Sequence, residues 1–213
     1  MPRTADHDAR RAQIAAAVVR LVAGDGLDAA TVARVAAEAG VSVGLVQHYF
    51  PAKDDMLLFA YERVMTDAGS RVAQRIAEGE ARQGTINGVV LDSLMELLPV
   101  DEARRAEYRV ARAFHGRALD NAALTEVARR WAEDIRRRLS VAVQNGTECG
   151  EVDPETDAEL AAVRMVALVG GLAEQVYRDA DRPVGARTMA AAAERILRDC
   201  LDDVFAGECR HYM

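Results

Sequence analysis

Hydrophobic residues recur at every third or fourth position along most of this chain, a spacing typical of amphipathic helices. The pattern predicts a first helix over residues 8–23, ended by the glycines that follow it. Two shorter helices are predicted within residues 31–50, and a long helix begins at residue 53 or 54. The apolar stripe of this long helix continues to Ile76 without a break, so we expect a rigid connector in place of a flexible linker.

Turn-forming residues divide the remaining sequence into further helical segments. These segments cover residues 85–98, 101–119, 121–145, 155–177 and 185–205. We expect a break over residues 145–150 and a loop at residues 181–183. No run of strict period-two alternation indicates a sheet, so the pattern predicts an all-α fold.

Composition supports this fold and bears on the cellular location that we expect for the protein. The chain has 213 residues, half of them hydrophobic and only 5 of them proline, so a sizeable helical core can form. No apolar stretch approaches the ~20 uninterrupted residues that a membrane span needs. The first residues are polar and lack the apolar centre of a signal peptide. We therefore expect a cytoplasmic protein without a membrane partner.

Motifs that carry enzymatic or metal chemistry are missing from the sequence. Cys149, Cys200 and Cys209 are odd in number and lack CxxC spacing, which argues against a disulfide framework and against a zinc site. We find no GxSxG, no phosphate-binding glycine loop, no HExxH and no convincing pair of carboxylates. The sequence therefore predicts no enzyme, no cofactor and no metal.

The net charge of −7 gives the chain no general attraction to nucleic acid. Residues 1–56 carry six positive and seven negative side chains and therefore sum to −1. Any binding to DNA must then depend on the local placement of hydrogen-bond donors, and we expect weak affinity for random duplex.

Residues 31–53 have the layout of a helix-turn-helix. Thr31 can cap a helix, Gly40 can supply the turn, and Ser42 can cap a second helix that ends before Pro51. The stretch from Gly40 to Lys53 reads GVSVGLVQHYFPAK and is followed by Met-Leu-Leu. Together with the helix before it, this stretch closely resembles the DNA-binding domain of the TetR (tetracycline-repressor) family over residues 8–60.

The resemblance implies an N-terminal three-helix helix-turn-helix domain, joined by a long helix to a larger helical domain for ligand binding and dimerisation. We place the DNA-binding domain at residues 1–54, the larger domain at 55–206 and a tail at 207–213. The implied partners are a double-stranded DNA operator with an inverted repeat, a second copy of the chain and a small-molecule inducer.

The second helix of a helix-turn-helix reads the major groove. Gln47 can donate to and accept from adenine, and Val43 can meet a thymine methyl group. Gly44 either lets the backbone approach the DNA or is a simple packing glycine. Val43 and Gln47 depart from the family, which often has a basic residue at the first position and an aromatic or apolar one at the second. The outward positions of this helix are Ser42, Val43, Gly44, Gln47 and His48.

Further DNA contacts are implied by the resemblance. It places His48 and Tyr49 near phosphates or base edges, and Lys53 at a phosphate. Thr31 can offer its hydroxyl and the helix N-terminal amides to a phosphate, or it can be a plain cap. Basic residues near the N-terminus are either solvated or reach the DNA from a mobile arm; they are Arg3, Arg10 and Arg11.

The resemblance also implies pairing through the last two long helices as a four-helix bundle. Each of these helices carries a stripe of apolar or small residues, although such stripes also form intramolecular cores. The adjacent glycines 170 and 171 either permit close helix approach or mark a kink. The predicted interface residues are Leu160, Val163, Ala167, Gly170, Gly171, Met189, Ala193, Ile196, Cys200 and Val204.

The middle helices would then enclose a pocket with apolar walls and a few polar groups. Many of the candidates are equally suited to ordinary core, and His115 could instead be a surface histidine. The predicted ligand-binding residues are Tyr61, Met65, Met95, Leu98, Tyr108, Arg112, Phe114, His115, Trp131, Met165 and Glu174. Additional lining candidates are Leu94, Ile135, Leu168 and Gln175.

The combined interpretation is a sequence-specific transcriptional repressor that a small molecule, expected to be apolar or aromatic, releases from its operator. An activator of the same fold is one alternative, because the effect depends on operator position. A helical small-molecule-binding protein without operator binding is another, although it would have little use for residues 48–53.

Overall fold

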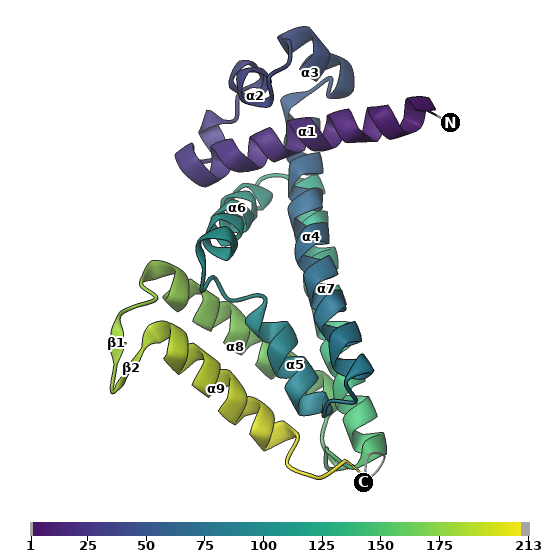
Figure 1. Ribbon diagram of the computed structural model, residues 1–213, viewed down its shortest axis with the longest axis vertical. Coiled ribbons are helices and arrows are strands. Elements are labelled where there is room, and N and C mark those ends of the chain that lie inside the picture. Colours follow the sequence, from purple (N-terminus) through teal and green to yellow (C-terminus); the bar gives the residue numbers. More distant parts are fainter. Residues whose placement is uncertain (1, 210–213) are drawn as a thin grey trace. The chain divides into compact units, whose positions relative to one another are not determined.

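A computed structural model of the chain describes the backbone of residues 2–209 and the side chains of residues 7–209 (Figure 1). The described part is almost entirely helical, which confirms the all-α prediction. Its helices are α1 (Pro2–Asp25), the 3-10 turn η1 (Leu27–Ala29), α2 (Val32–Ala39), α3 (Val43–Tyr49), α4 (Lys53–Ala81), α5 (Ile86–Met95), α6 (Glu102–Ala118), α7 (Ala122–Cys149), α8 (Ala158–Arg178) and α9 (Met189–Val204).

Contacts between residues divide the molecule into two compact units. The N-terminal unit comprises residues up to 67 together with 106–129, and the C-terminal unit comprises 68–105 together with the chain from 130 onward. The functional boundary at residue 54 stays a prediction, since a division by contacts does not test where DNA binding ends.

The N-terminal unit is built around the buried face of α1, which packs against α2. Ile14, Val18 and Val22 of α1 are buried at the helical spacing that the sequence predicts. Gln13 of α1 holds the end of α2, because its side-chain amide donates to the carbonyl of Ala39 at 2.8 Å. These contacts hold α2 and the turn after it on a packed helix.

The C-terminal unit contains α5, α8 and α9, and α9 packs against both of the others. Leu197 and Leu201 of α9 are almost completely buried. A buried carboxylate, Glu96, follows α5 and accepts from Arg75 of α4, with a 2.7 Å contact between the charged groups. Arg104 at the start of α6 lies 3.7 Å away. A buried carboxylate needs such partners, since burying an unpaired charge is costly.

The predicted break at residues 145–150 is wrong, because α7 continues to Cys149. Gly146 is a packing residue: a Cβ there would lie 2.5 Å from a methyl carbon of Val152 and 3.0 Å from the ring of Phe205. The chain turns at Gly150, where φ is +98°, a conformation that glycine adopts without strain. The sequence signal was therefore a close approach of chain segments and not a helix end.

A small hairpin precedes the last helix, where the sequence predicts a loop followed by helix from residue 185. Strands β1 (Pro183–Val184) and β2 (Arg187–Thr188) pair antiparallel around Gly185, which has a φ of +59°. The last helix begins only at Met189, because the Thr188 side chain accepts from the amide of Ala191 and caps it.

By length and composition alone, α8 could cross a membrane. Core helices of globular proteins share these properties, and α8 packs one face against α9.

Candidate DNA-binding surface and ligand cavity

The helix-turn-helix forms from the caps that the sequence predicts. The Thr31 hydroxyl accepts from the amide of Arg34 at 3.3 Å, and the Ser42 hydroxyl accepts from the amide of Leu45 at 3.1 Å. Between them, Gly40 adopts the left-handed conformation with a φ of +67° and ends α2. Thr31 and Ser42 therefore act as caps, which fixes where α2 and α3 begin.

One face of α3 is exposed and the other is in the core. Val46 and the following Phe50 are buried, whereas Leu45 lies at the boundary. The positions predicted to face outward are all exposed, including the apolar Val43, which keeps 42% of its surface. These exposed residues are Ser42, Val43, Gly44, Gln47 and His48.

The end of α3 is braced by aromatic and cationic contacts from α1 and α4. The ring of Tyr49 lies 4.9 Å from that of His7 and 5.2 Å from that of His48. The Arg11 guanidinium lies over Phe59, with 4.2 Å to the ring centre, and also over Phe50. Tyr49 is consequently half-buried. These contacts fix the orientation of α3 on its neighbours.

The alternative of a mobile basic arm is wrong for Arg10 and Arg11, because both lie within α1. Arg11 serves the packing just described, and Arg10 donates to Gln13 at 3.0 Å. The side chain of Arg3 lies outside the described residues. Thr31 and Lys53 are both exposed, and Lys53 is the first residue of α4.

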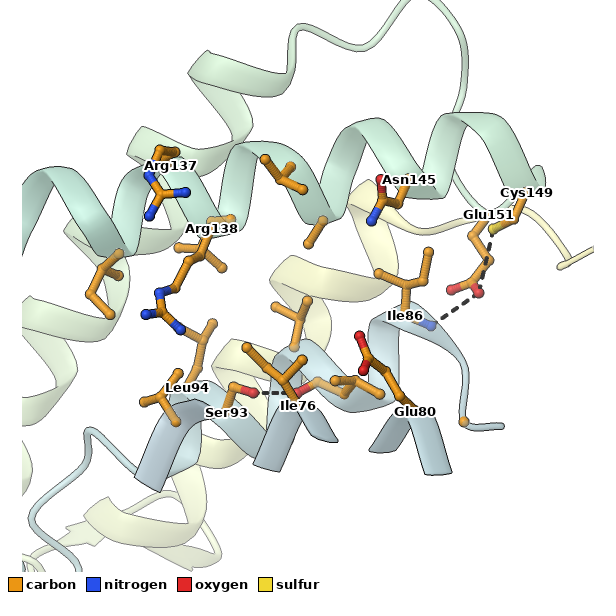
Figure 2. Close-up of a pocket in the computed structure, with 18 of the residues that line it drawn as sticks. Ile76, Glu80, Ile86, Ser93, Leu94, Arg137, Arg138, Asn145, Cys149 and Glu151 are labelled. Atoms are coloured by element: carbon orange, nitrogen blue, oxygen red, sulfur yellow. Dashed lines mark hydrogen bonds between the residues drawn. The ribbon is translucent and has the colours of Figure 1, made fainter. Parts of the chain in front are cut away.

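A cavity of about 470 Å³ lies in the C-terminal unit among α4, α5 and α7 (Figure 2). Ile76, Val90 and Leu139 belong to its mainly apolar wall. Arg137 and Arg138 of α7 also line the cavity, and both form ion pairs with Asp134. The remaining polar groups are Glu80, Ser93, Asn145, Glu148 and Glu151. The volume suits a small organic molecule.

None of the eleven predicted ligand-binding residues lines this cavity. Leu94 and Ile135, which the sequence offered as additional candidates, do line it. The cavity uses one face of α7 on which apolar residues lie among polar ones, and arginines such as Arg137 and Arg138 are typical of a solvated face. The eleven residues lie elsewhere.

Three of the eleven form a cluster within the N-terminal unit. Tyr61 stacks on Phe114 with 4.9 Å between ring centres, and its hydroxyl lies 3.3 Å from Nε2 of His115. Burial raises the pKa of Tyr61 to about 12. His115 is exposed by surface area, yet partial burial of its ring lowers its pKa, an effect that the Ala111 carbonyl opposes and the Arg112 charge reinforces. Both groups are therefore neutral at pH 7.

The others divide between the core and the surface. Leu98 and Met165 are almost fully buried, and Met65 is buried as well. Trp131 is half-buried, and a Cβ on Gly69 would lie 3.2 Å from its ring. Glu174 pairs with Arg178 at 2.9 Å. The last three residues are half-buried or exposed: Met95, Tyr108 and Arg112.

The predicted dimer stripe is exposed on α8 but buried on α9. Leu160, Val163, Ala167, Gly170 and Gly171 all lie on the exposed face of α8. On α9, Ile196 keeps 40% of its surface. The other α9 positions were predicted on the wrong face, because they form the core beneath the helix: Met189, Ala193, Cys200 and Val204.

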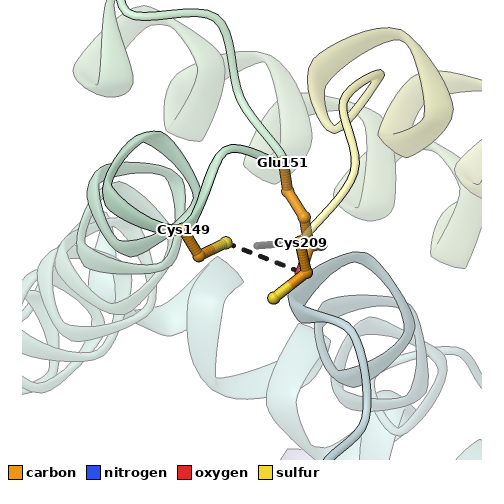
Figure 3. Close-up of side chains that lie close together, drawn as sticks. All are labelled: Cys149, Glu151 and Cys209. Carbon is orange, nitrogen blue, oxygen red and sulfur yellow. Dashed lines mark hydrogen bonds between the residues drawn. The ribbon is translucent and has the colours of Figure 1, made fainter. Parts of the chain in front are cut away.

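The structure also gathers side chains that the sequence left apart (Figure 3). Cys149, Glu151 and Cys209 come together at one end of the cavity, and their ligand atoms lie within 4.8 Å of one another. Sequence spacing could not reveal this group, because 57 residues separate Glu151 from Cys209. The only signal was the glycine-rich break near residue 150.

A capped helix-turn-helix with an exposed second helix defines a DNA-binding regulator of transcription, and comparison with known proteins gives its family. Residues 14–59 match the tetR family of bacterial regulatory proteins. Residues 89–205 match the C-terminal region of BetI-type transcriptional repressors. The chain therefore belongs to the TetR family of transcriptional regulators, and it is not an enzyme.

Individual relatives agree along almost the whole chain. The HTH-type transcriptional regulator PksA of Bacillus subtilis is 29% identical over 211 residues, which cover 99% of this chain and 100% of PksA. A transcriptional regulator from Rhodococcus sp. Rha1 is 32% identical, with a TM-score of 0.75 and coverage of 92% of this chain and 96% of its own. The multidrug binding protein EbrR, solved with imidazole, is 25% identical, with a TM-score of 0.63 and coverage of 90% and 94%.

Proposed function

We propose that this regulator is a cytoplasmic repressor that binds an inverted-repeat operator as a homodimer and leaves it when a small molecule binds. The exposed face of α3 is the observation that carries the proposal. Its side chains can donate and accept hydrogen bonds, while the unit around it has no excess of positive charge. Such a surface favours a specific sequence over random duplex.

In this proposal, Gln47 reads a base and Val43 contacts a thymine methyl group. Gly44 lets the backbone of α3 approach the groove, a role supported by the open space around its Cα. Phosphates are held by the exposed Lys53 and by the amides at the start of α2, next to Thr31. His48 and Tyr49 complete the surface at the end of α3.

The proposed dimer uses the exposed face of α8 and Ile196 of α9. Leu160 keeps 68% of its surface and Val163 keeps 50%, which is unusual for two aliphatic residues one turn apart. The glycines of α8 would let a second helix approach closely. Sedimentation should show a dimer at micromolar concentration, and the double change Leu160→Glu with Val163→Glu should give a monomer. A wild-type monomer at that concentration would contradict this part of the proposal.

The proposed ligand site is the cavity among α4, α5 and α7. Its walls favour an apolar or aromatic molecule, and the nearby arginines and carboxylates can orient a polar end. EbrR, which has the same fold, is a multidrug binding protein. Contact of a ligand with the Tyr61, Phe114 and His115 cluster also stays a prediction.

For the ligand to act as a switch, it must bind the DNA-free conformation more tightly than the bound one. A change of two to three decades in operator affinity requires a difference of about 3–4 kcal/mol. α4 would transmit the change, because it is one continuous helix from Lys53 to Ala81. Calorimetry that finds equal ligand affinity with and without operator would exclude this coupling.

Filling the cavity tests its role directly. Ala142 lines the cavity on α7, so Ala142→Phe should keep operator binding and abolish release by the ligand. The matched control is Ala132→Phe, an exposed position on the same helix outside the cavity lining. Both variants would be assayed on the operator found by selection of bound DNA fragments. Equal release in the two variants would place the ligand outside this cavity.

Selection of bound fragments also separates the alternatives. A shared inverted repeat supports the repressor, and transcription from a promoter with that repeat distinguishes repression from activation. Absence of any enriched sequence at moderate salt would favour a ligand-binding protein without an operator.

A further inference from the structure

Three side chains that can bind metal ions converge in the C-terminal unit, outside the DNA-binding surface. Cys149 ends α7, Glu151 lies in the connection to α8, and Cys209 lies beyond α9 (Figure 3). The two sulfur atoms and a carboxylate oxygen are all within 4.8 Å of one another. The main chain supports this arrangement, because the amide of Gly207 donates to the carbonyl of Glu151 at 2.9 Å.

The spacing of these atoms is close to that of a tetrahedral metal site. Zinc binds cysteine sulfur at about 2.3 Å and carboxylate oxygen at about 2.1 Å. Tetrahedral angles then put a sulfur and an oxygen ligand about 3.6 Å apart, and two sulfur ligands about 3.8 Å apart. The observed distance from Cys149 Sγ to Glu151 Oε1 is 3.7 Å. Only small movements would therefore bring the three atoms onto one ion.

The carboxylate is fixed in place before any ion arrives. Glu151 is only 3% exposed, and its two oxygens accept from the amides of Ile86 and Asn87 at 3.0 and 3.1 Å. These amides belong to the N-terminal end of α5, where partial positive charge offsets negative charge. Each carboxylate oxygen has a second lone pair with which it can bind a cation.

The two thiols differ in their surroundings. Cys149 is buried, and burial is the main reason that its thiol pKa is raised. This thiol therefore keeps its proton when no ion is bound. Cys209 is half-buried, so an ion can reach the group from the solvent side.

We propose that Cys149, Glu151 and Cys209 form a binding site for one thiophilic divalent cation of the zinc class. Two thiolates and one carboxylate supply three ligands, and the adjoining cavity leaves room for a water molecule as the fourth. Binding displaces one proton from each thiol and changes no oxidation state. A disulfide would use only the two sulfurs and would need an oxidant. The bound ion would tie residues 206–209 to the ends of α7 and α5.

Cobalt(II) provides a direct test, because thiolate ligands give it a charge-transfer absorption. Full-length protein without an affinity tag would be reduced, freed of metal under anaerobic conditions and titrated with Co²⁺. We expect saturation at one equivalent, a spectrum of tetrahedral type and displacement of cobalt by Zn²⁺. Cys209→Ser should weaken binding by about 100-fold or more, since it removes a direct ligand. Cys149→Ser should have the same effect.

Cys200 supplies the matched control, because this buried cysteine of α9 is outside the group. Cys200→Ala should bind cobalt as the wild type does. Because Cys209 is only half-buried and lies beyond the last helix, its serine variant should keep the helical circular dichroism of the wild type. Glu151 is left unchanged, since its substitution would also remove the contacts to α5.

Several outcomes would overturn the proposal. One is a reduced wild type without thiolate-to-cobalt absorption, and another is a Cys209→Ser variant that binds as tightly as the wild type. A third is a Cys149–Cys209 disulfide in the isolated protein, combined with failure of the reduced form to bind cobalt. That result would assign a redox pair in place of a metal site. The test is independent of operator binding and of the proposed repressor function.

Discussion

The candidate DNA-binding surface and the candidate ligand cavity present their side chains in opposite ways. The N-terminal unit exposes residues of one short helix, α3, whose opposite face is in the core. The C-terminal unit contains a cavity lined by α4 and α5, which follow each other in sequence, and by α7, which comes later in the chain. On α3, the residues proposed to contact DNA are therefore different from the buried residues that stabilise the helix. Around the cavity and in the core next to it, one side chain can both line the cavity and stabilise the fold. Substitutions there should therefore lower the stability of the fold before they change anything else.

The largest effect is expected for a core residue of the C-terminal unit. Met165 of α8 is 1% exposed, and Met165→Ala should lower the free energy of unfolding by about 2–5 kcal/mol through the cavity it leaves. Urea denaturation at fixed protein concentration would measure it. Gln175→Ala, at an exposed position of the same helix that is not assigned to the dimer face, is the control, with a loss well under that of Met165→Ala. Equal losses would mean that the two faces of α8 do not differ as described.

The next effect concerns a residue of the exposed face of α3. Gln47→Ala should leave stability unchanged within about 0.5 kcal/mol. It should reduce discrimination at one base pair in each half-site by about 1–3 kcal/mol. Binding selection on the wild type and the variant would reveal the relaxed position. An unchanged sequence profile would remove Gln47 from the set of base-reading residues.

A smaller effect is expected at the start of α4. Lys53→Ala should weaken binding to all sequences alike, because a phosphate contact carries no sequence information. The slope of the logarithm of affinity against the logarithm of salt concentration should fall by about one. Titrations at several salt concentrations would measure this slope. A change in base preference would instead show that Lys53 takes part in reading the sequence.

The smallest effect is a dependence of stability on pH through His115. The folded protein lowers the pKa of this histidine below 6.5, so the unfolded chain binds the proton more readily. Stability should therefore fall as the pH drops below about 6.5 and should not change through this group above it. His115→Gln should flatten the dependence measured by urea denaturation between pH 5 and 7. His48→Gln, on the exposed face of α3, is the control.

The contrast between the two units also explains what the sequence could predict. Thr31, Gly40 and Ser42 act through neighbours within a few positions, so their spacing predicts the caps and the turn that form α3. Gly146 looks like a helix end in the sequence, yet it allows Val152 and Phe205 to pack closely. Such a contact depends on the tertiary structure and leaves no local pattern.

The same limit applies to helix faces in the C-terminal unit. An apolar stripe on α9 predicts a buried face, but it does not say whether the burying partner is the same chain or a second copy. Cys200 and Val204 belong to the intramolecular core, whereas Ile196 is exposed. The cavity was missed for a related reason, because Arg137 and Arg138 carry charges typical of a solvated face.

The contact of Glu151 with α5 affects the order in which parts of this protein can fold during synthesis. The amides of Ile86 and Asn87 receive their carboxylate partner from a residue 65 and 64 positions further along the chain. When α5 leaves the ribosome, that partner has not been synthesised, so the start of α5 waits until the whole of α7 has been made. The amide of Gly207, which holds the carbonyl of Glu151, is made later still. The N-terminal helices can fold during synthesis before this happens, whereas the cavity reaches its final form only after Gly207 has been made.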